Sequence, residues 1–258
     1  GEHAAAAQLL APVHADLLAR LGPQHPMTVA AVSELALATL RLGRQAELAT
    51  WLAALRNGSG PDDAWRIDHA DTLAAMAQLE AGQADAAEPA LRRLLAALLR
   101  DEGGVSAATE PVRRLHAEAL LRLGRLPEAE AELRSTLANQ QALVPAAATG
   151  GHPSTATTRV LLGVALARQG DLPAARQHWA EAAPALAKAL GPAHPHAVVA
   201  ACYAALAAAP GSPQAADRSA LAAQLQQRLG WQQGSAALLA MLRAPGSPPD
   251  WRQLPVVL

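Results

Sequence analysis

The sequence predicts an all-α fold in which pairs of helices repeat along the chain. Alanine, leucine, arginine and glutamate, which favour helices, dominate the 258 residues, whereas aromatic residues, which favour strands, make up only 2%. A glycine between two helical patterns also recurs about every 42 residues. Such a period is typical of arrays in which each repeat is one supersecondary unit stacked on its neighbours. We therefore expect a solenoid of stacked antiparallel helix pairs.

Five glycines mark the turns inside the expected helix pairs. They follow one another at steps of 39, 42, 46 and 41 residues: Gly43, Gly82, Gly124, Gly170 and Gly211. Gly1 precedes the first of them by 42 residues, in the same register. Glycine reaches positive φ without a steric penalty, so each can close a first helix. Asp or Pro soon after the turn, as in Asp171 and Pro173, then favours the start of a second helix.

Small and large residues recur in register with these turns. Seven residues before the first four turns stand Ala36, Ala75, Ala117 and Gly163. Five residues after the turns stand Ala6, Leu48, Ala87, Ala129, Ala175 and Ala216, and nine residues after them stand Leu10, Leu52, Leu91, Leu133 and Trp179. Small residues let two helices approach closely, and the large residue fills the space between neighbouring pairs. The register therefore indicates one packing scheme used several times.

Three related motifs indicate where first helices begin. "LGPQHP" starts at Leu21, "LGPAHP" at Leu190 and "GGHPST" at Gly150. In this interpretation Leu-Gly ends one helix, Pro breaks it, and His-Pro starts the next. We expect the three histidines of these motifs to cap or pack at helix starts rather than bind a metal: His25, His152 and His194.

These motifs resemble the tetratricopeptide repeat (TPR), in the 42-residue form of kinesin light chains and of C-terminal regions of bacterial Ser/Thr protein kinases and regulators. The resemblance rests on "LGPQHPMT" at 21–28, "GRLPEAEAEL" at 124–133 and "HPST" at 152–155, and covers roughly residues 1–230. The second pair lacks a His-Pro entry, and Gln45, Ala84, Leu126 and Leu172 stand where the family has a turn aromatic. The resemblance implies a right-handed superhelical scaffold that binds proteins.

The expected elements begin with a single helix at 1–21, whose partner would lie upstream of Gly1. Helix pairs follow at about 26–57, 62–101, 109–143, 153–190 and, more loosely, 195–230, with a capping helix at 234–243. Together these make a solenoid over 1–243. The remaining residues, 244–258, are rich in Pro and Gly and predict an extended or mobile tail. Pro89 and Pro184 fall inside expected helices, where an interior proline costs about 3 kcal/mol and kinks the helix.

Composition and motifs argue against several function classes. A net charge of −1 gives no general attraction to nucleic acid, and no apolar run reaches the roughly 18 residues that insertion into a membrane needs. Phosphate loops, nucleophile elbows and paired-cysteine metal sites are absent from the sequence. The single cysteine, Cys202, is expected in the core. We therefore predict no catalytic residue, no metal and no cofactor.

First helices line the concave face in such arrays, and the repeat register assigns its residues. The predicted peptide-binding set is Ser33, Arg41, His69, Thr72, Met76, Glu80, Arg114, Glu118, Arg122, Thr157 and Arg168, with Val160 and Val164 between the last two. Its last position in successive units reads Arg41, Glu80, Arg122 and Arg168. Three spaced arginines could pair with an acidic segment or a free C-terminus. The helix dipole also favours arginine at a helix end without any ligand, and this alternative stays open.

The sequence thus favours a non-catalytic protein- or peptide-binding scaffold or sensory module, as the regulatory region of a larger bacterial signalling protein such as a Ser/Thr kinase. One alternative is a small-ligand receptor or an enzyme built on a helical solenoid, with a cavity opened by Pro89 or Pro184. Another is a homodimer formed through exposed end helices. Localisation is left open between the bacterial cytoplasm and, for the C-terminal region of a membrane-spanning kinase, the periplasm.

Overall fold

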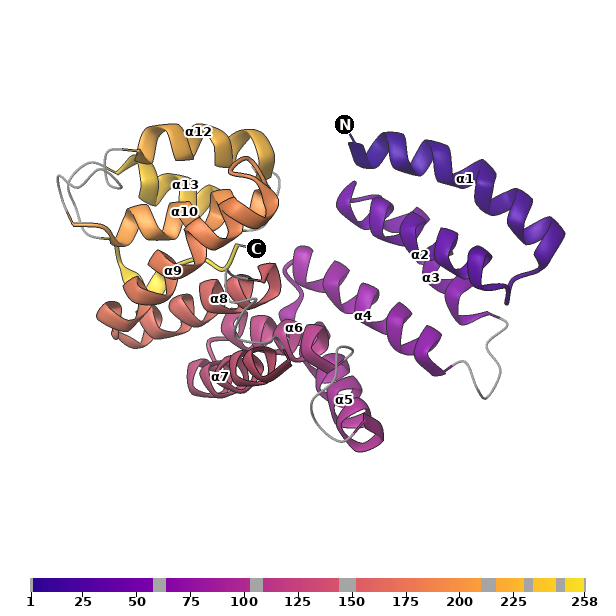
Figure 1. Ribbon diagram of the computed structural model, residues 1–258, viewed down its shortest axis with the longest axis horizontal. Helices are drawn as coiled ribbons and strands as arrows, with labels where there is room; N and C mark the ends of the chain where they lie inside the picture. The colour runs from indigo at the N-terminus through magenta and orange to yellow at the C-terminus, as the bar shows by residue number, and fades with distance from the viewer. Residues whose placement is uncertain are drawn as a thin grey trace. The chain divides into compact units, whose positions relative to one another are not determined.

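The computed structural model describes residues 2–57, 64–102, 109–143, 152–209, 217–229, 234–244 and 249–257. All regular secondary structure in these ranges is helical, which confirms the all-α class (Figure 1). None of the described helices is both long enough and apolar enough to cross a membrane. The chain divides into two compact units, Gly1–Leu94 and Leu95–Leu258, and each is described by itself.

Unit 1 stacks its helices in chain order. It contains α1 (Glu2–Leu21), α2 (Pro26–Arg41), α3 (Gln45–Arg56), α4 (Ala64–Glu80) and the first part of α5 (Ala84–Glu102). From α1 to α4 each helix contacts the next, and the two first helices α2 and α4 also contact each other (Figure 1). Leu48, Leu52 and Leu55 of α3 pack against apolar residues of α2 and α4 to form the core.

Unit 2 continues the same scheme and adds an end structure. Its helices after α5 are α6 (Thr109–Arg122), α7 (Leu126–Leu143), α8 (Pro153–Gln169), α9 (Leu172–Leu190), α10 (Pro195–Ala207), α12 (Arg218–Leu229), α13 (Ser235–Arg243) and the 3-10 turn η2 (Trp251–Gln253). Successive helices from α6 to α10 contact each other. The first helix α8 also contacts the first helices α6 and α10, so first helices stack on first helices.

Glycine turns close the helix pairs as the sequence indicated. Gly43, Gly82, Gly124 and Gly170 have φ values of 67°, 78°, 75° and 95°. Backbone amides at these turns donate to carbonyls in the last turn of the preceding helix, as Gly170 does to Ala167. Gly1, Gly211 and Ala216 lie outside the described residues. The chain therefore reverses at the positions that the 42-residue period assigned.

The small positions are buried in both units, and one of them explains a departure from the pattern. Ala36, Ala75 and Ala117 are at most 1% exposed, and Gly163 is also buried. A Cβ atom added to Gly163 would lie 2.7 Å from Cε2 of Trp179. Gly163 has no side chain because the large residue of its own helix pair is tryptophan rather than leucine.

Three histidines cap first helices, as predicted. The Nδ1 atoms of His25, His152 and His194 accept hydrogen bonds from the backbone amides of Met27, Ser154 and His196, at 3.2, 3.3 and 3.2 Å. Each histidine stands directly before the proline that opens its helix. The cap satisfies one of the amides that a helix start leaves without an intrahelical partner. This role answers why the His-Pro motif recurs.

Prolines do not end the helices in which they lie. Helix α5 runs through Pro89 and α9 runs through Pro184, as α1 does through Pro12, which the sequence analysis did not single out. Pro89 and Pro184 therefore lie within continuous helices and do not interrupt them.

The C-terminal segment, residues 249–257, differs most from expectation. The sequence predicted an extended or mobile tail, but Leu254, Val256 and Val257 are 0%, 5% and 0% exposed. They belong to the same buried cluster as Val160 of α8 and Tyr203 of α10. The side chains of Leu254, Val256 and Val257 supply apolar surface that holds the segment on the helices. Residues 254–257 have no regular secondary structure, as expected of an extended tail, but they pack on the helices, which the sequence did not predict.

Candidate functional site

Six predicted site residues lie on the contacting first helices of unit 1. We call this set the α2–α4 face: Ser33, Arg41, His69, Thr72, Met76 and Glu80. All six are half-buried. Arg41 Nη1 donates to Glu80 Oε1 at 2.7 Å, and this ion pair links the ends of α2 and α4. The structure thus brings together two residues that stand 39 positions apart in the sequence.

The other residues of the α2–α4 face differ in the contacts that their side chains make. Thr72 donates to the carbonyl of Asp68 at 2.7 Å, and Met76 packs against the core of unit 1. Burial lowers the pKa of His69, while the charge of Glu34 on α2 acts in the opposite direction. Polar groups and one flexible apolar side chain therefore share the face.

The predicted residues of α6 form a second ion pair. Arg122 Nη2 donates to Glu118 Oε1 at 2.8 Å, one helical turn away. Both side chains are about 90% buried, at 10% and 7% exposed. Arg114, the third predicted residue of this helix, is half-buried. The pair is thus satisfied within one helix.

A partly buried polar cluster between α6 and α7 was not predicted from the sequence. Asn139 Nδ2 donates to Glu110 Oε1 at 3.0 Å, and Arg113 Nη1 donates to the Ser135 hydroxyl at 2.9 Å and lies 3.6 Å from Glu132 Oε2. Burial raises the pKa of Glu110, against the effects of Asn139 and Arg113. In the part of the chain that the structure describes, no three His, Cys, Asp or Glu residues gather as metal ligands. The cluster instead joins the two helices of one pair.

On α8, the predicted site residues are covered rather than open. Val160 and Val164 are 0% exposed, and Thr157 is buried and donates to the carbonyl of Pro153 at 2.8 Å. Arg168 donates from Nε to the carbonyl of Leu254 at 2.7 Å and from Nη1 to that of Leu121 at 2.6 Å. Burial lowers the pKa of Arg168. The expectation of an open face at α8 is therefore wrong, because the C-terminal segment lies there.

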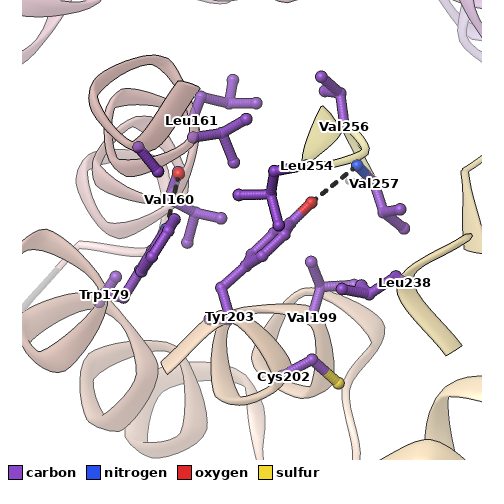
Figure 2. Close-up of a cluster of buried hydrophobic side chains, with 14 of the residues drawn as sticks. Val160, Leu161, Trp179, Val199, Cys202, Tyr203, Leu238, Leu254, Val256 and Val257 are labelled. Atoms are coloured by element: carbon purple, nitrogen blue, oxygen red, sulfur yellow. Dashed lines mark hydrogen bonds between the residues drawn. The ribbon is translucent and has the colours of Figure 1, made fainter. Parts of the chain in front are cut away.

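Tyr203 of α10 holds the same segment and was not among the predicted residues. Its hydroxyl donates to the carbonyl of Pro255 at 2.7 Å and accepts from the amide of Val257 at 3.0 Å, the bond drawn in Figure 2. Its ring stacks on that of Trp179 at 5.5 Å between centroids. Burial raises the pKa of Tyr203, which keeps its phenol protonated. As the only tyrosine in a chain without phenylalanine, it was a signal that the sequence analysis could have used.

Cys202, beside Tyr203, lies in the core as predicted. It is 0% exposed, and burial raises the pKa of its thiol to about 12. A thiol with such a pKa is protonated near neutral pH and is a weak nucleophile. Cys202 is therefore an apolar packing residue.

An open cavity of about 560 Å³ lies beside Pro184 of α9. Alanines of α9, of α10 and of the two residues after α10 form most of its wall, and Arg176 is the charged residue that lines it. The cavity lacks the converging titratable groups that an enzyme site would need, and it is not enclosed.

Comparisons with known proteins agree with this architecture. BtubC (BKLC) from P. vanneervenii matches with a TM-score of 0.60 and 16% identity over 99% of this chain and 96% of that one. Nearly identical TPR-like repeats of a candidate kinesin light chain from Podosopora anserina match with a TM-score of 0.53 and 19% identity, over 85% and 95% of the two chains.

The fold is TPR-like. No family model matches the chain, and no curated protein matches it in sequence. At these identities the solved structures establish the TPR-like architecture alone. What the TPR-like helices bind therefore depends on the side chains that they expose.

Proposed function

We propose that this chain is a non-catalytic scaffold that binds a segment of another protein. The α2–α4 face supports this most directly, because the two first helices contact each other, Arg41 pairs with Glu80 between them, and all six side chains of the set are half-buried. Helical repeats of this kind commonly recognise protein segments along such stacked helices. The alternative of an enzyme built on the solenoid has no comparable set of converging groups among the described residues.

An acidic partner segment would bind by competing with Glu80 for Arg41. The side chain of Arg41 is 29% exposed in its ion pair, so it remains partly accessible to solvent and ligands. A partner carboxylate could form the paired hydrogen bonds that arginine favours. Arg168 is less suited to this role, because its Nε and Nη1 atoms already donate to two backbone carbonyls. We therefore centre the proposed acidic-ligand site on Arg41.

The test begins with partners captured by the intact chain and identified by mass spectrometry. Binding of the recovered segment is then measured for Arg41→Ala, Glu80→Gln and the matched control Arg44→Ala, which removes a charge outside the face. We expect about a 5- to 30-fold loss for Arg41→Ala, a gain for Glu80→Gln and no change for the control. Equal affinities for all four proteins would exclude the α2–α4 face as the binding surface.

We infer a regulatory role in a larger bacterial signalling protein, such as a Ser/Thr kinase, from the resemblance of the Leu-Gly-x-x-His-Pro motifs alone. The sequence of the whole gene product tests this inference. A kinase domain in the same polypeptide would support it, and an unrelated enzyme domain there would contradict it.

Self-association through α1 is a second candidate, favoured by exposed apolar residues on that helix. Leu9 and Val13, one turn apart, are 71% and 48% exposed. Exposed apolar surface of this kind often marks an interface. Light scattering over a range of concentrations should show dimers that Leu9→Glu with Val13→Glu abolishes and the control Ala15→Glu preserves. A monomer at every concentration would reject this candidate.

A further inference from the structure

The C-terminal segment is held largely through its backbone, by side chains from two first helices. The carbonyl of Leu254 accepts from Arg168 of α8, the carbonyl of Pro255 accepts from Tyr203 of α10, and the amide of Val257 donates to the same hydroxyl. These residues belong to no helix or strand. Their polar groups are satisfied by side chains in the way that a bound extended peptide would be.

Apolar side chains of the segment fit between helices. Leu254, Val256 and Val257 lie among Val160 and Leu161 of α8, Val199 of α10 and Leu238 of α13 (Figure 2). The backbone also approaches Gly234 so closely that an added Cβ would lie 3.0 Å from the carbonyl oxygen of Val256. We call the residues that hold the segment the tail site: Val160, Arg168, Tyr203, Gly234 and Leu238.

We propose that the tail site is a peptide-binding site, occupied within the same chain by residues 254–257, and that a partner protein binds it with an extended segment of the same chemistry. That chemistry is a large aliphatic residue, a proline and two further aliphatic residues, as in Leu254–Val257. The inference deepens the proposed scaffold function, because it names a second surface and the kind of segment that fits it.

The chain's own segment acts as a competitor. Ten residues separate the end of α13 at Arg243 from Leu254, so the effective concentration of the segment at the tail site is high. A free peptide of equal affinity must displace it, and binding to the intact chain is weakened by about 10²- to 10⁴-fold relative to an empty site. Release of residues 254–257 would therefore regulate whether a partner segment can bind the tail site.

The first experiment uses the full chain with a protease site in place of residues 245–248. After folding and cutting, a fluorescent peptide with the sequence of residues 249–258 is added to cut and uncut protein. We expect the cut protein to exchange its segment for the labelled peptide, with an affinity at least about 100-fold higher than that of uncut protein. A peptide carrying Asp in place of Leu254 should not bind.

A second experiment avoids cutting. In intact Leu254→Asp the segment should leave the tail site, so that the wild-type peptide binds about 100-fold more tightly than it does to the wild-type chain. Gln253→Asp is the matched control, because Gln253 is exposed and its change should leave the site occupied. Added peptide should also restore hydrogen-exchange protection to α8 and α10 in Leu254→Asp.

Several outcomes would overturn the proposal. Cut protein that keeps its segment for days without exchange, or that unfolds, would make the segment a fixed part of the core. Equal binding of the peptide to cut and uncut protein would place its site elsewhere. Dimers of the wild-type chain formed by exchanged segments would make a second copy the occupant instead. Each of these leaves the proposed scaffold function of the α2–α4 face intact, since Arg41→Ala tests that face separately.

Discussion

The α2–α4 face of unit 1 and the equivalent positions of α8 in unit 2 follow one repeat register but have different surroundings. In unit 1 the register position before the turn carries Arg41, which pairs with Glu80 and remains 29% exposed. In unit 2 it carries Arg168, whose donors hold Leu254 and Leu121. A repeat register therefore predicts on which side of a helix a side chain lies. Whether a partner can contact that side chain also depends on segments outside the repeats, such as residues 249–257.

The largest effect should come from uncovering α8. Leu254→Asp places a charge where a fully buried leucine packs, and we expect a loss of about 4 kcal/mol in the free energy of unfolding. Gln253→Asp should change it by less than about 0.5 kcal/mol. Denaturant unfolding with hydrogen exchange of α8 and α10 checks this, and unchanged protection in Leu254→Asp would mean that the segment does not support unit 2.

The next effect concerns the Gly163–Trp179 pair of the α8–α9 hairpin; the equivalent positions carry Ala36 and Leu52 in unit 1, and Ala117 and Leu133 elsewhere in unit 2. Gly163→Ala should cost about 1–3 kcal/mol, because the added methyl group overlaps the indole. In a Trp179→Leu background the same change should be nearly neutral. Denaturant unfolding of the four proteins gives the coupling free energy, and additive effects would contradict the size match.

Removal of the two register arginines should separate the two regions. Arg168→Ala leaves the carbonyl of Leu254 without its side-chain donor and removes one of the two donors to the carbonyl of Leu121, which keeps the amide of Gly124, and we expect a loss of about 2–3 kcal/mol in the free energy of unfolding. Arg41→Ala removes a partly exposed ion pair and should cost about 1 kcal/mol or less. Thermal and denaturant unfolding measure both, and equal losses would show that the two positions do not differ as described.

The smallest effect should be a pH dependence shared by both units. Burial lowers the pKa of His69 in unit 1 and of His178 in unit 2, where Arg159 also lowers it and Glu181 opposes. Because the folded state disfavours the charged ring, each contributes stability above the ordinary pKa of 6.5 that is lost as pH falls through it. Between about pH 7.5 and pH 5.5, the free energy of unfolding should decrease less for His69→Gln and for His178→Gln than for the wild type. A decrease as large as that of wild type would contradict this origin.

The sequence was sufficient for the features that depend on local chemistry. Glycines at the turns and the histidine caps act through backbone conformation and hydrogen bonds a few residues away, so spacing alone located them. The buried small positions followed from the same period. These features establish the helix pairs but not the surface on which a partner binds.

Contacts between residues far apart in the sequence could not be predicted from spacing in this way. The C-terminal segment has the Pro and Gly content of a mobile tail, and only its contacts with Arg168 and Tyr203, 86 and 52 residues away, reveal that it is bound. Likewise, Glu110 and Arg113 are charged residues of α6 whose side chains are only 7% and 12% exposed. Hydrogen bonds and ion pairs with residues of α7 offset the free-energy cost of burying these two charges. The repeat period does not predict which residues of α7 lie beside them.

The fit of Gly163 to Trp179 bears on how such an array can be altered. Both residues belong to the α8–α9 hairpin, so copying or transplanting the hairpin carries the matched sizes along. Grafting α9 alone behind a first helix with alanine at that position would press the indole against a methyl group. For duplication during evolution and for recombination in the laboratory, the exchangeable piece is therefore the hairpin rather than the single helix.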